Sequence, residues 1–278
     1  MPIVAKSDLS AENKAHASYL LRCGQLLFLI TAPYSATIST VDTNTASIPT
    51  FSHAACRAFI AAHGLAVRSV AIEVDDAELA YSISVSNGAK SFSLPITLGE
   101  PENSVVISEV QVYNDAVLRY ISYTKPTVDI ASTFLSGFEP IETSSSFPGQ
   151  NYDLRCLDHA FGTVPELASA VNYLKSFTGF HKFAEIGGED IGTIESWLNT
   201  VCLACNDETV ILGLCEPVYG TPWTSQILTY FEHNEGPGFQ HLALESEDIF
   251  WTLREMKQRS GFGGLALMPP PLRLTTGI

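Results

Sequence analysis

The sequence predicts an α+β protein with two domains. Its 278 residues suffice for two domains that each bury a hydrophobic core. Residues 64–89 align without gaps with residues 236–261, at a constant offset of 172 positions, which indicates an internal repeat. In the second half of the chain, single helices alternate with runs of strands, and this order is typical of α+β folds.

The two copies of the repeat share one pattern. In each copy a glycine precedes a short alternating strand, an acidic or hydroxyl pair starts a helix, and Gly88 or Gly261 closes the helix. One face of the strand carries Val67, Ser69 and Ala71 in the first copy and Phe239, His241 and Ala243 in the second. We interpret the repeat as a structural duplication in which the position of Ser69 is taken by His241.

A cluster of Ser, Gly and Pro over residues 126–152 separates the two patterned regions. Such loop-forming residues are typical of a connection between domains. We therefore predict an N-terminal domain over residues 1–134, a linker over residues 135–152 and a C-terminal domain over residues 153–278.

The C-terminal domain opens with alternating apolar residues at 157–161, which predict a strand. Thr163 and Glu166 form a capping box, with Pro165 in the first turn, so we expect a helix there that ends at Gly179. Apolar runs then predict strands over residues 180–186, 195–205 and 210–218. A short helix near residues 225–232, the repeat strand and a helix from residue 247 complete the domain.

The composition excludes several classes of protein. There are 15 Lys and Arg residues against 30 Asp and Glu residues, a formal net charge of −15, which argues against a nucleic-acid partner or an anionic membrane. No apolar run reaches the roughly 20 residues that span a bilayer, and the first residues lack a secretory signal. We therefore expect a cytoplasmic protein, in which the six cysteines, including the Cys202–Cys205 pair, stay free thiols.

Two of the seven histidines, His159 and His241, lie on short strands that begin strand–helix units. If these strands are equivalent members of two half-repeats, both imidazoles converge on one curved sheet. Two neutral imidazoles and one carboxylate form the facial triad that binds Fe(II) and leaves positions for a chelating substrate and O2. The alternative is that each histidine is a core residue with a backbone hydrogen bond.

Other signatures are weaker or absent. Neither His159 nor His241 is followed by the acid of a His-x-Asp or His-x-Glu motif. His233 and Glu235 have that spacing, but they lie where a helix is expected to end, so a solvated cap competes with a metal pair. The chain contains no GxSxG, GxxxxGK[ST] or HExxH motif, which argues against serine hydrolases, P-loop NTPases and zincins.

Many segments closely resemble 4-hydroxyphenylpyruvate dioxygenases, especially the plant enzymes, and the resemblance covers nearly the whole chain. These segments are residues 155–167, 177–181, 203–208, 230–236, 239–244 and 246–250, together with residues 5–10, 16–20, 31–35 and 70–74. That family is similar to other vicinal-oxygen-chelate proteins, whose paired βαβββ modules form curved mixed half-barrel sheets. The resemblance implies two such domains, the first of them non-catalytic.

The resemblance also implies a cofactor and an activity. It implies Fe(II) ligated by His159 and His241, with Thr200 and Gln226 as substrate-binding residues. The implied partners are a small-molecule 2-oxo acid and O2. The implied reaction is oxidative decarboxylation and ring hydroxylation of 4-hydroxyphenylpyruvate to homogentisate, a step of tyrosine catabolism.

The chain departs from the family at several points. The family's third iron ligand is a glutamate on a late strand, which we expect to lie beyond Ile278, and the first module lacks its opening strand and helix. We therefore expect both domains to be truncated, the third ligand to be missing and the activity to be impaired. In the expected pocket, Gly213 replaces a proline, Cys215 replaces an asparagine and Thr200 replaces a serine.

An alternative follows from the same departures. The chain is then a catalytically dead remnant or a pseudogene product, which acts, if at all, by pairing with itself or with a full-length paralogue. Missing end strands would expose sheet edges, and unpaired edges favour association. This alternative predicts a homo-oligomer.

Overall fold

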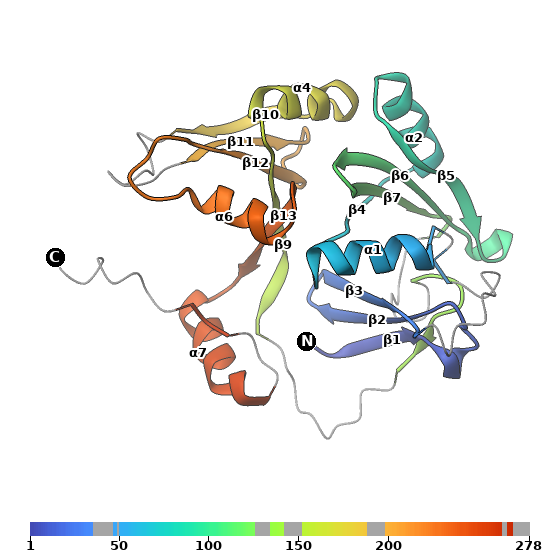
Figure 1. Ribbon diagram of the computed structural model, residues 1–278. Coiled ribbons are helices and arrows are strands. Elements are labelled where there is room, and N and C mark those ends of the chain that lie inside the picture. Colours follow the sequence, from blue (N-terminus) through green and yellow to red (C-terminus); the bar gives the residue numbers. More distant parts are fainter. Residues whose placement is uncertain are drawn as a thin grey trace.

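The computed structural model describes residues 1–35, 47–48, 50–125, 134–141, 152–187, 198–262 and 266–268. Within these ranges the chain forms three sheets flanked by helices, as Figure 1 shows. The α+β class expected from the sequence is confirmed. None of the helices in the described ranges has the length and apolar character needed to cross a membrane.

The first half of the chain contains two four-stranded sheets. One has the order β3-β2-β1-β8, and the other has the order β4-β7-β6-β5. Their elements are β1 (Ile3–Ser7), β2 (His16–Cys23), β3 (Leu26–Pro33), α1 (His53–His63), β4 (Ser69–Glu73), α2 (Ala77–Ser86), β5 (Ser91–Leu98), β6 (Val105–Tyr113), β7 (Ala116–Tyr123) and β8 (Glu139–Pro140), with short 3-10 turns at Leu9–Ala11 and Pro101–Asn103.

The second half forms one five-stranded sheet in the order β10-β11-β12-β9-β13. Its elements are β9 (Leu154–Thr163), α4 (Leu167–Thr178), β10 (His181–Ile186), β11 (Leu198–Ala204), β12 (Ile211–Pro217), α6 (Gln226–His233), β13 (Gly238–Ser246) and α7 (Ile249–Arg259), followed by a 3-10 turn at Ser260–Phe262. This is the order of strands and helices that the sequence predicts. Residues 195–197 of one expected strand lie outside the described residues.

The start of α4 corrects one expectation. Thr163 does not cap the helix, because it is still part of β9 and its hydroxyl donates to the carbonyl oxygen of Gly238 at 3.3 Å. Glu166 is itself the N-cap, and its carboxylate accepts hydrogen bonds from the backbone amides of Ala168 and Ser169. Pairing of β9 with strands on both sides keeps Thr163 extended, so the predicted capping box is wrong.

The internal repeat extends to a third copy. The helices α2, α4 and α7 are all N-capped by an acidic side chain, from Asp76, Glu166 and Asp248 respectively. Seven positions before these caps stand Ser69, His159 and His241. The unit β4–β7 also has the same strand order as β9–β12, with the first and last strands parallel in both. Each histidine therefore occupies the equivalent position of a strand–helix unit.

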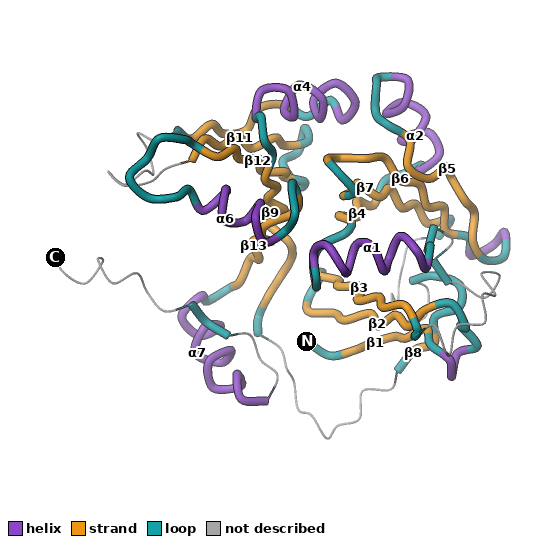
Figure 2. Tube along the Cα trace, in the orientation of Figure 1, coloured by secondary structure: helices purple, strands orange, loops and turns teal. Residues whose placement is uncertain are grey.

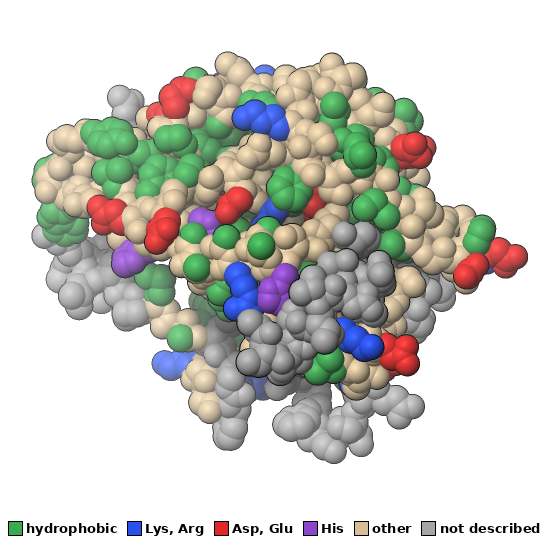
Figure 3. Space-filling view, turned by 45° about the vertical axis from the view of Figure 1, so that its right-hand side comes forward, with side chains coloured by type: hydrophobic (Ala, Val, Ile, Leu, Met, Phe, Trp, Pro, Cys, Tyr) green, Lys and Arg blue, Asp and Glu red, His purple; other side chains and the backbone are tan. Residues whose placement is uncertain are grey.

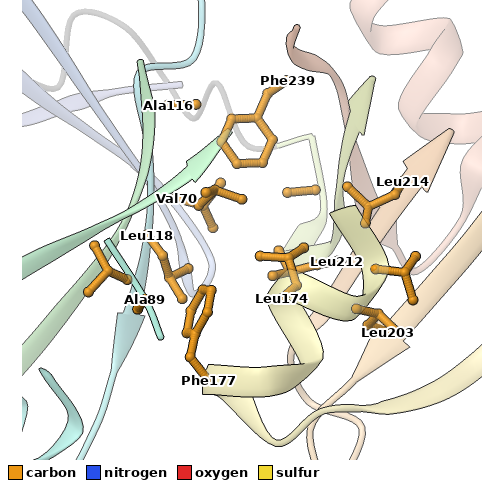
Figure 4. Packing of buried hydrophobic residues seen from close by; sticks show 14 of the residues in the cluster. Val70, Ala89, Ala116, Leu118, Leu174, Phe177, Leu203, Leu212, Leu214 and Phe239 are labelled. Atoms are coloured by element: carbon orange, nitrogen blue, oxygen red, sulfur yellow. The ribbon is translucent and has the colours of Figure 1, made fainter. Parts of the chain in front are cut away.

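A large hydrophobic cluster joins the two halves. Val70 and Leu118 from the first half lie close to Leu174 and Phe177 of α4, as Figure 4 shows, and all four are buried. The helices α2 and α4 also lie side by side above this core (Figure 1). Burial of each large apolar side chain contributes roughly 2 kcal/mol, which makes this contact a strong one.

The predicted division into domains stays a prediction. Phe134, Leu135 and Phe138 are buried against the β1–β2 sheet, and β8 pairs with β1. The start of the expected linker therefore adds to the first half of the structure. Residues 142–151 of that linker lie outside the described residues.

A buried histidine in the first half gives a testable pH dependence. The side chain of His16 is fully buried, next to the Ser18 hydroxyl at 2.9 Å and the ring of Phe51 at 4.5 Å. Burial lowers the pKa of His16 to about 4, whereas an unfolded histidine titrates near 6.5. As the pH falls through this window, the unfolded state takes up a proton that the folded state does not bind, so stability falls with it.

We expect the free energy of unfolding to be lower at pH 5 than at pH 7 by roughly 2 kcal/mol on account of His16. Urea unfolding at the two pH values measures this difference. Replacing His16 with Gln should make the difference smaller by about that amount. An unchanged pH dependence in H16Q would show that His16 is not the group responsible.

Candidate functional site

The two candidate ligands lie on neighbouring strands and on one face of the five-stranded sheet. In the antiparallel pairing of β9 with β13, His241 lies opposite Phe161, and Ala243 lies opposite His159. The ring centroids of His159 and His241 are 5.8 Å apart, with an angle of 74° between the ring planes. The fold therefore brings together two imidazoles that are far apart in the sequence.

Each imidazole uses its Nδ1 atom in a local hydrogen bond. The Nδ1 atom of His159 donates to a carboxylate oxygen of Asp158 at 2.5 Å, and that of His241 donates to the side-chain oxygen of Gln240 at 3.0 Å. Within the described residues, neither Nε2 atom makes a hydrogen bond. A partner on Nδ1 fixes the tautomer and leaves the Nε2 lone pair available to a metal ion.

The surroundings of His241 favour its neutral form. Burial of the ring lowers the pKa of His241, and the nearby His159 lowers it further. The residue as a whole is nevertheless solvent exposed, and the side chain of His159 is 27% exposed. The pair thus lies at the surface of the sheet, where a metal ion or a small ligand can reach it, and a neutral imidazole is the form that binds a metal.

The two faces of this sheet have different partners. Helix α4 packs on one face, against Leu203, Leu212 and Leu214. On the opposite face, Ile227 of α6 packs against Phe161 and Cys215. Figure 2 shows α4 and α6 on either side of the strands. The histidines share the face of Phe161, so α6 covers part of the candidate site.

Phe161 lies between the histidines and the rest of this face. Its ring is stacked on that of His241, with centroids 4.6 Å apart and planes 13° apart, and its centroid is 6.0 Å from that of His159. Sequence reasoning did not single out Phe161. The available signal was its position two residues after His159 on the same strand, which places both side chains on one face.

Thr200 and Gln226 are placed differently. Thr200 lies on β11 opposite Cys215, is 3% exposed, and its hydroxyl has no hydrogen-bond partner among the described residues. Gln226 is the first residue of α6 and is exposed, next to the buried Ile227. Thr200 therefore lies on the face of the histidines, and α6 carries Gln226 beside that face.

The other sites considered from the sequence receive no support from geometry. His233 is the last residue of α6, and Glu235 follows it with a positive φ, both of them exposed. Cys202 and Cys205 are free thiols. Within the described parts of the chain, no cluster of three or more His, Cys, Asp or Glu side chains could hold a metal ion. In agreement with this, the acidic side chains on the face shown in Figure 3 are scattered and do not form one group.

Comparison with known proteins identifies the relatives of the chain. It is 57% identical over 274 residues to the 4-hydroxyphenylpyruvate dioxygenase of Arabidopsis thaliana and 55% identical over 271 residues to that of Plectranthus scutellarioides. These matches cover 98% of this chain but 60% and 61% of the relatives. The chain thus spans about 60% of the length of the curated relatives that it matches, and no protein-family model matches it.

Solved structures support the fold. A mutant of 4-hydroxymandelate synthase from Streptomyces coelicolor matches with a TM-score of 0.72 at 16% identity, covering 93% of this chain and 67% of that one. A xylose isomerase-like TIM barrel/4-hydroxyphenylpyruvate dioxygenase fusion protein matches with a TM-score of 0.58 at 20% identity, covering 98% and 36%. The expected vicinal-oxygen-chelate fold and the resemblance to 4-hydroxyphenylpyruvate dioxygenases are both confirmed.

Proposed function

We propose that this chain, a homologue of plant 4-hydroxyphenylpyruvate dioxygenases, is an Fe(II)-dependent dioxygenase that converts 4-hydroxyphenylpyruvate to homogentisate. The observation that carries the proposal is the pair of imidazoles, His159 and His241, on one sheet face with their ring centroids 5.8 Å apart. Both Nε2 atoms are available to a metal ion. Neither ring is a buried core histidine with a backbone hydrogen bond.

The residues present fit two of the three positions of a facial triad. Two imidazole nitrogens suit Fe(II), which in such sites also takes one carboxylate. Asp158 is not suited to that role, because its carboxylate accepts the hydrogen bond from Nδ1 of His159 and so orients this ring. The carboxylate that completes the site would come from outside the described residues or from another chain.

The rest of this face suits an aromatic 2-oxo acid. When bound, Fe(II) supplies positions for the two oxygens of the 2-oxo acid and for activation of O2. Phe161, Cys215 and Ile227 pack against one another on the same side of the sheet and are buried, so they form an apolar cluster beside the histidines that excludes water. The buried hydroxyl of Thr200 has no protein partner among the described residues, so a substrate that reached between α6 and this face would find an unpaired polar group there.

The test is product formation by the purified chain. With Fe(II), ascorbate and 4-hydroxyphenylpyruvate, we expect O2 uptake and homogentisate, both dependent on added iron. His241→Ala should lower turnover by at least about 100-fold, since even partners of metal ligands are worth about 10–100-fold. The absence of iron-dependent homogentisate at saturating substrate would overturn the proposal.

A further inference from the structure

The ring of Phe161 occupies space that any side chain at position 213 would need. Gly213 of β12 lies opposite Phe161 of β9, which in turn lies opposite His241 of β13. A Cβ atom added at Gly213 would lie 2.2 Å from Cδ2 and 2.5 Å from Cε2 of the Phe161 ring. These distances are far below van der Waals contact, so Phe161 can keep its position only while residue 213 is a glycine.

The need for glycine at this position is one of space and not of backbone conformation. Gly213 is not among the glycines with positive φ, and it lies within a regular run of β12 paired on both sides. Alanine would therefore be compatible with the backbone. The three atoms nearest to such a Cβ atom all belong to the ring of Phe161, so this ring is the obstacle.

The same ring restricts the orientation of His241. The imidazole stacks on Phe161 with only 13° between the planes. It also donates a hydrogen bond to Gln240 and contacts the ring of His159. Phe161 is 9% exposed and is fixed by Cys215 and Ile227, which are fully buried. A fixed ring that stacks on an exposed imidazole limits rotation of that imidazole about its χ2 angle.

We propose that Phe161 is a positioning residue for His241 and that Phe161 and Gly213 form a size-matched pair. The ring fills the space above Gly213 and holds the imidazole in the orientation in which its Nε2 atom faces the same site as His159. The part of this inference that concerns a metal ion rests on the proposed function. The part that concerns packing does not.

The pair predicts distinct effects for two properties of the protein. Gly213→Ala should lower the melting temperature, because it forces the ring of Phe161 out of its place. Phe161→Val should weaken Co(II) binding by about tenfold, as loss of a partner of a metal ligand does. The double variant should regain much of the melting temperature lost in G213A, because the smaller valine side chain leaves room for the new methyl group, but it should keep the weakened Co(II) binding.

The experiment compares the full chain with Gly213→Ala, Phe161→Val, the double variant and Gly261→Ala. The last is a matched control, since a Cβ atom at Gly261 would meet nothing within 4 Å. Calorimetry with Co(II) gives the affinity, and thermal unfolding gives the melting temperature. NMR of labelled histidine reports the stacking directly, because the ring protons of His241 should move downfield when Phe161 is replaced.

Each outcome decides one part of the inference. Additive losses of melting temperature in the double variant would overturn the size-matched pair. Full recovery of Co(II) affinity in the double variant, or unchanged His241 resonances in F161V, would overturn the positioning role. If the unsubstituted chain binds no Co(II), the proposed function fails, whereas the melting temperatures and the NMR shifts still decide for or against the pair.

Discussion

Replacing both His159 and His241 with alanine is expected to abolish the binding of one equivalent of Co(II), a substitute for Fe(II) that does not oxidise in air during the measurement. Each single substitution should weaken binding by at least about 100-fold, because it removes a ligand and not merely a partner of a ligand. Both side chains are at least partly exposed, so their loss should leave thermal stability nearly unchanged. Calorimetry and thermal unfolding measure the two effects separately.

His181→Ala is the control for this experiment. His181 begins β10, is exposed, and its Nε2 atom lies 3.6 Å from a carboxylate oxygen of Glu208. His181 thus has a carboxylate neighbour, as His159 does, but no other imidazole of the described residues is in contact with its ring. Binding should be unaffected in H181A. Co(II) binding that survives the double substitution of His159 and His241 would place the metal elsewhere and remove the basis of the proposed function.

The order of elements in the second half was predictable because local signals agree with the tertiary structure there. Alternating residues mark the strands, and Gly179 ends α4 with a positive φ. The exact start of α4 was not predictable in the same way. Whether Thr163 caps a helix or extends a strand depends on β12 and β13, which pair with β9 on both sides. Tertiary pairing prevailed over a local motif.

The candidate site could be predicted in part. His159 and His241 were identified because each stands on a strand before a helix. The offset of 172 positions showed that His241 is equivalent to Ser69. The equivalence of Ser69 with His159 was not identified from the sequence. The acidic N-caps at Asp76, Glu166 and Asp248 were the usable signal.

The stacking of Phe161 on His241 was beyond reach from the sequence. The register between β9 and β13 shifts between Phe239 and His241, and this irregularity places His241 directly opposite Phe161. A shift of one residue would have turned His241 to the face covered by α4. Sequence alone gives no measure of such a shift, so the stacking of the two rings depends on a tertiary feature.

The buried ion pair of the first half should have the largest effect on stability. Glu109 of β6 lies opposite Arg119 of β7, and its carboxylate accepts hydrogen bonds from Nε at 2.8 Å and Nη2 at 2.5 Å of the guanidinium. The side chains are only 2% and 14% exposed. Arg119→Met should lower the free energy of unfolding by about 3–5 kcal/mol, because it leaves the Glu109 carboxylate buried without its partner.

A second arginine moderates this expectation. Burial lowers the pKa of Arg68, and the charge of Glu109 acts in the opposite direction, so the two groups are close enough to interact. Arg68 can therefore offset part of the loss in R119M, which favours the lower half of the range. Because the cost comes from the unpaired charge, adding Glu109→Leu to R119M should restore most of the stability. The control is Lys182→Met in the exposed pair with Glu185, which should change the free energy of unfolding by less than about 1 kcal/mol. Urea unfolding of the four proteins provides the comparison, and a double variant as unstable as R119M would show that packing and not charge dominates at this position.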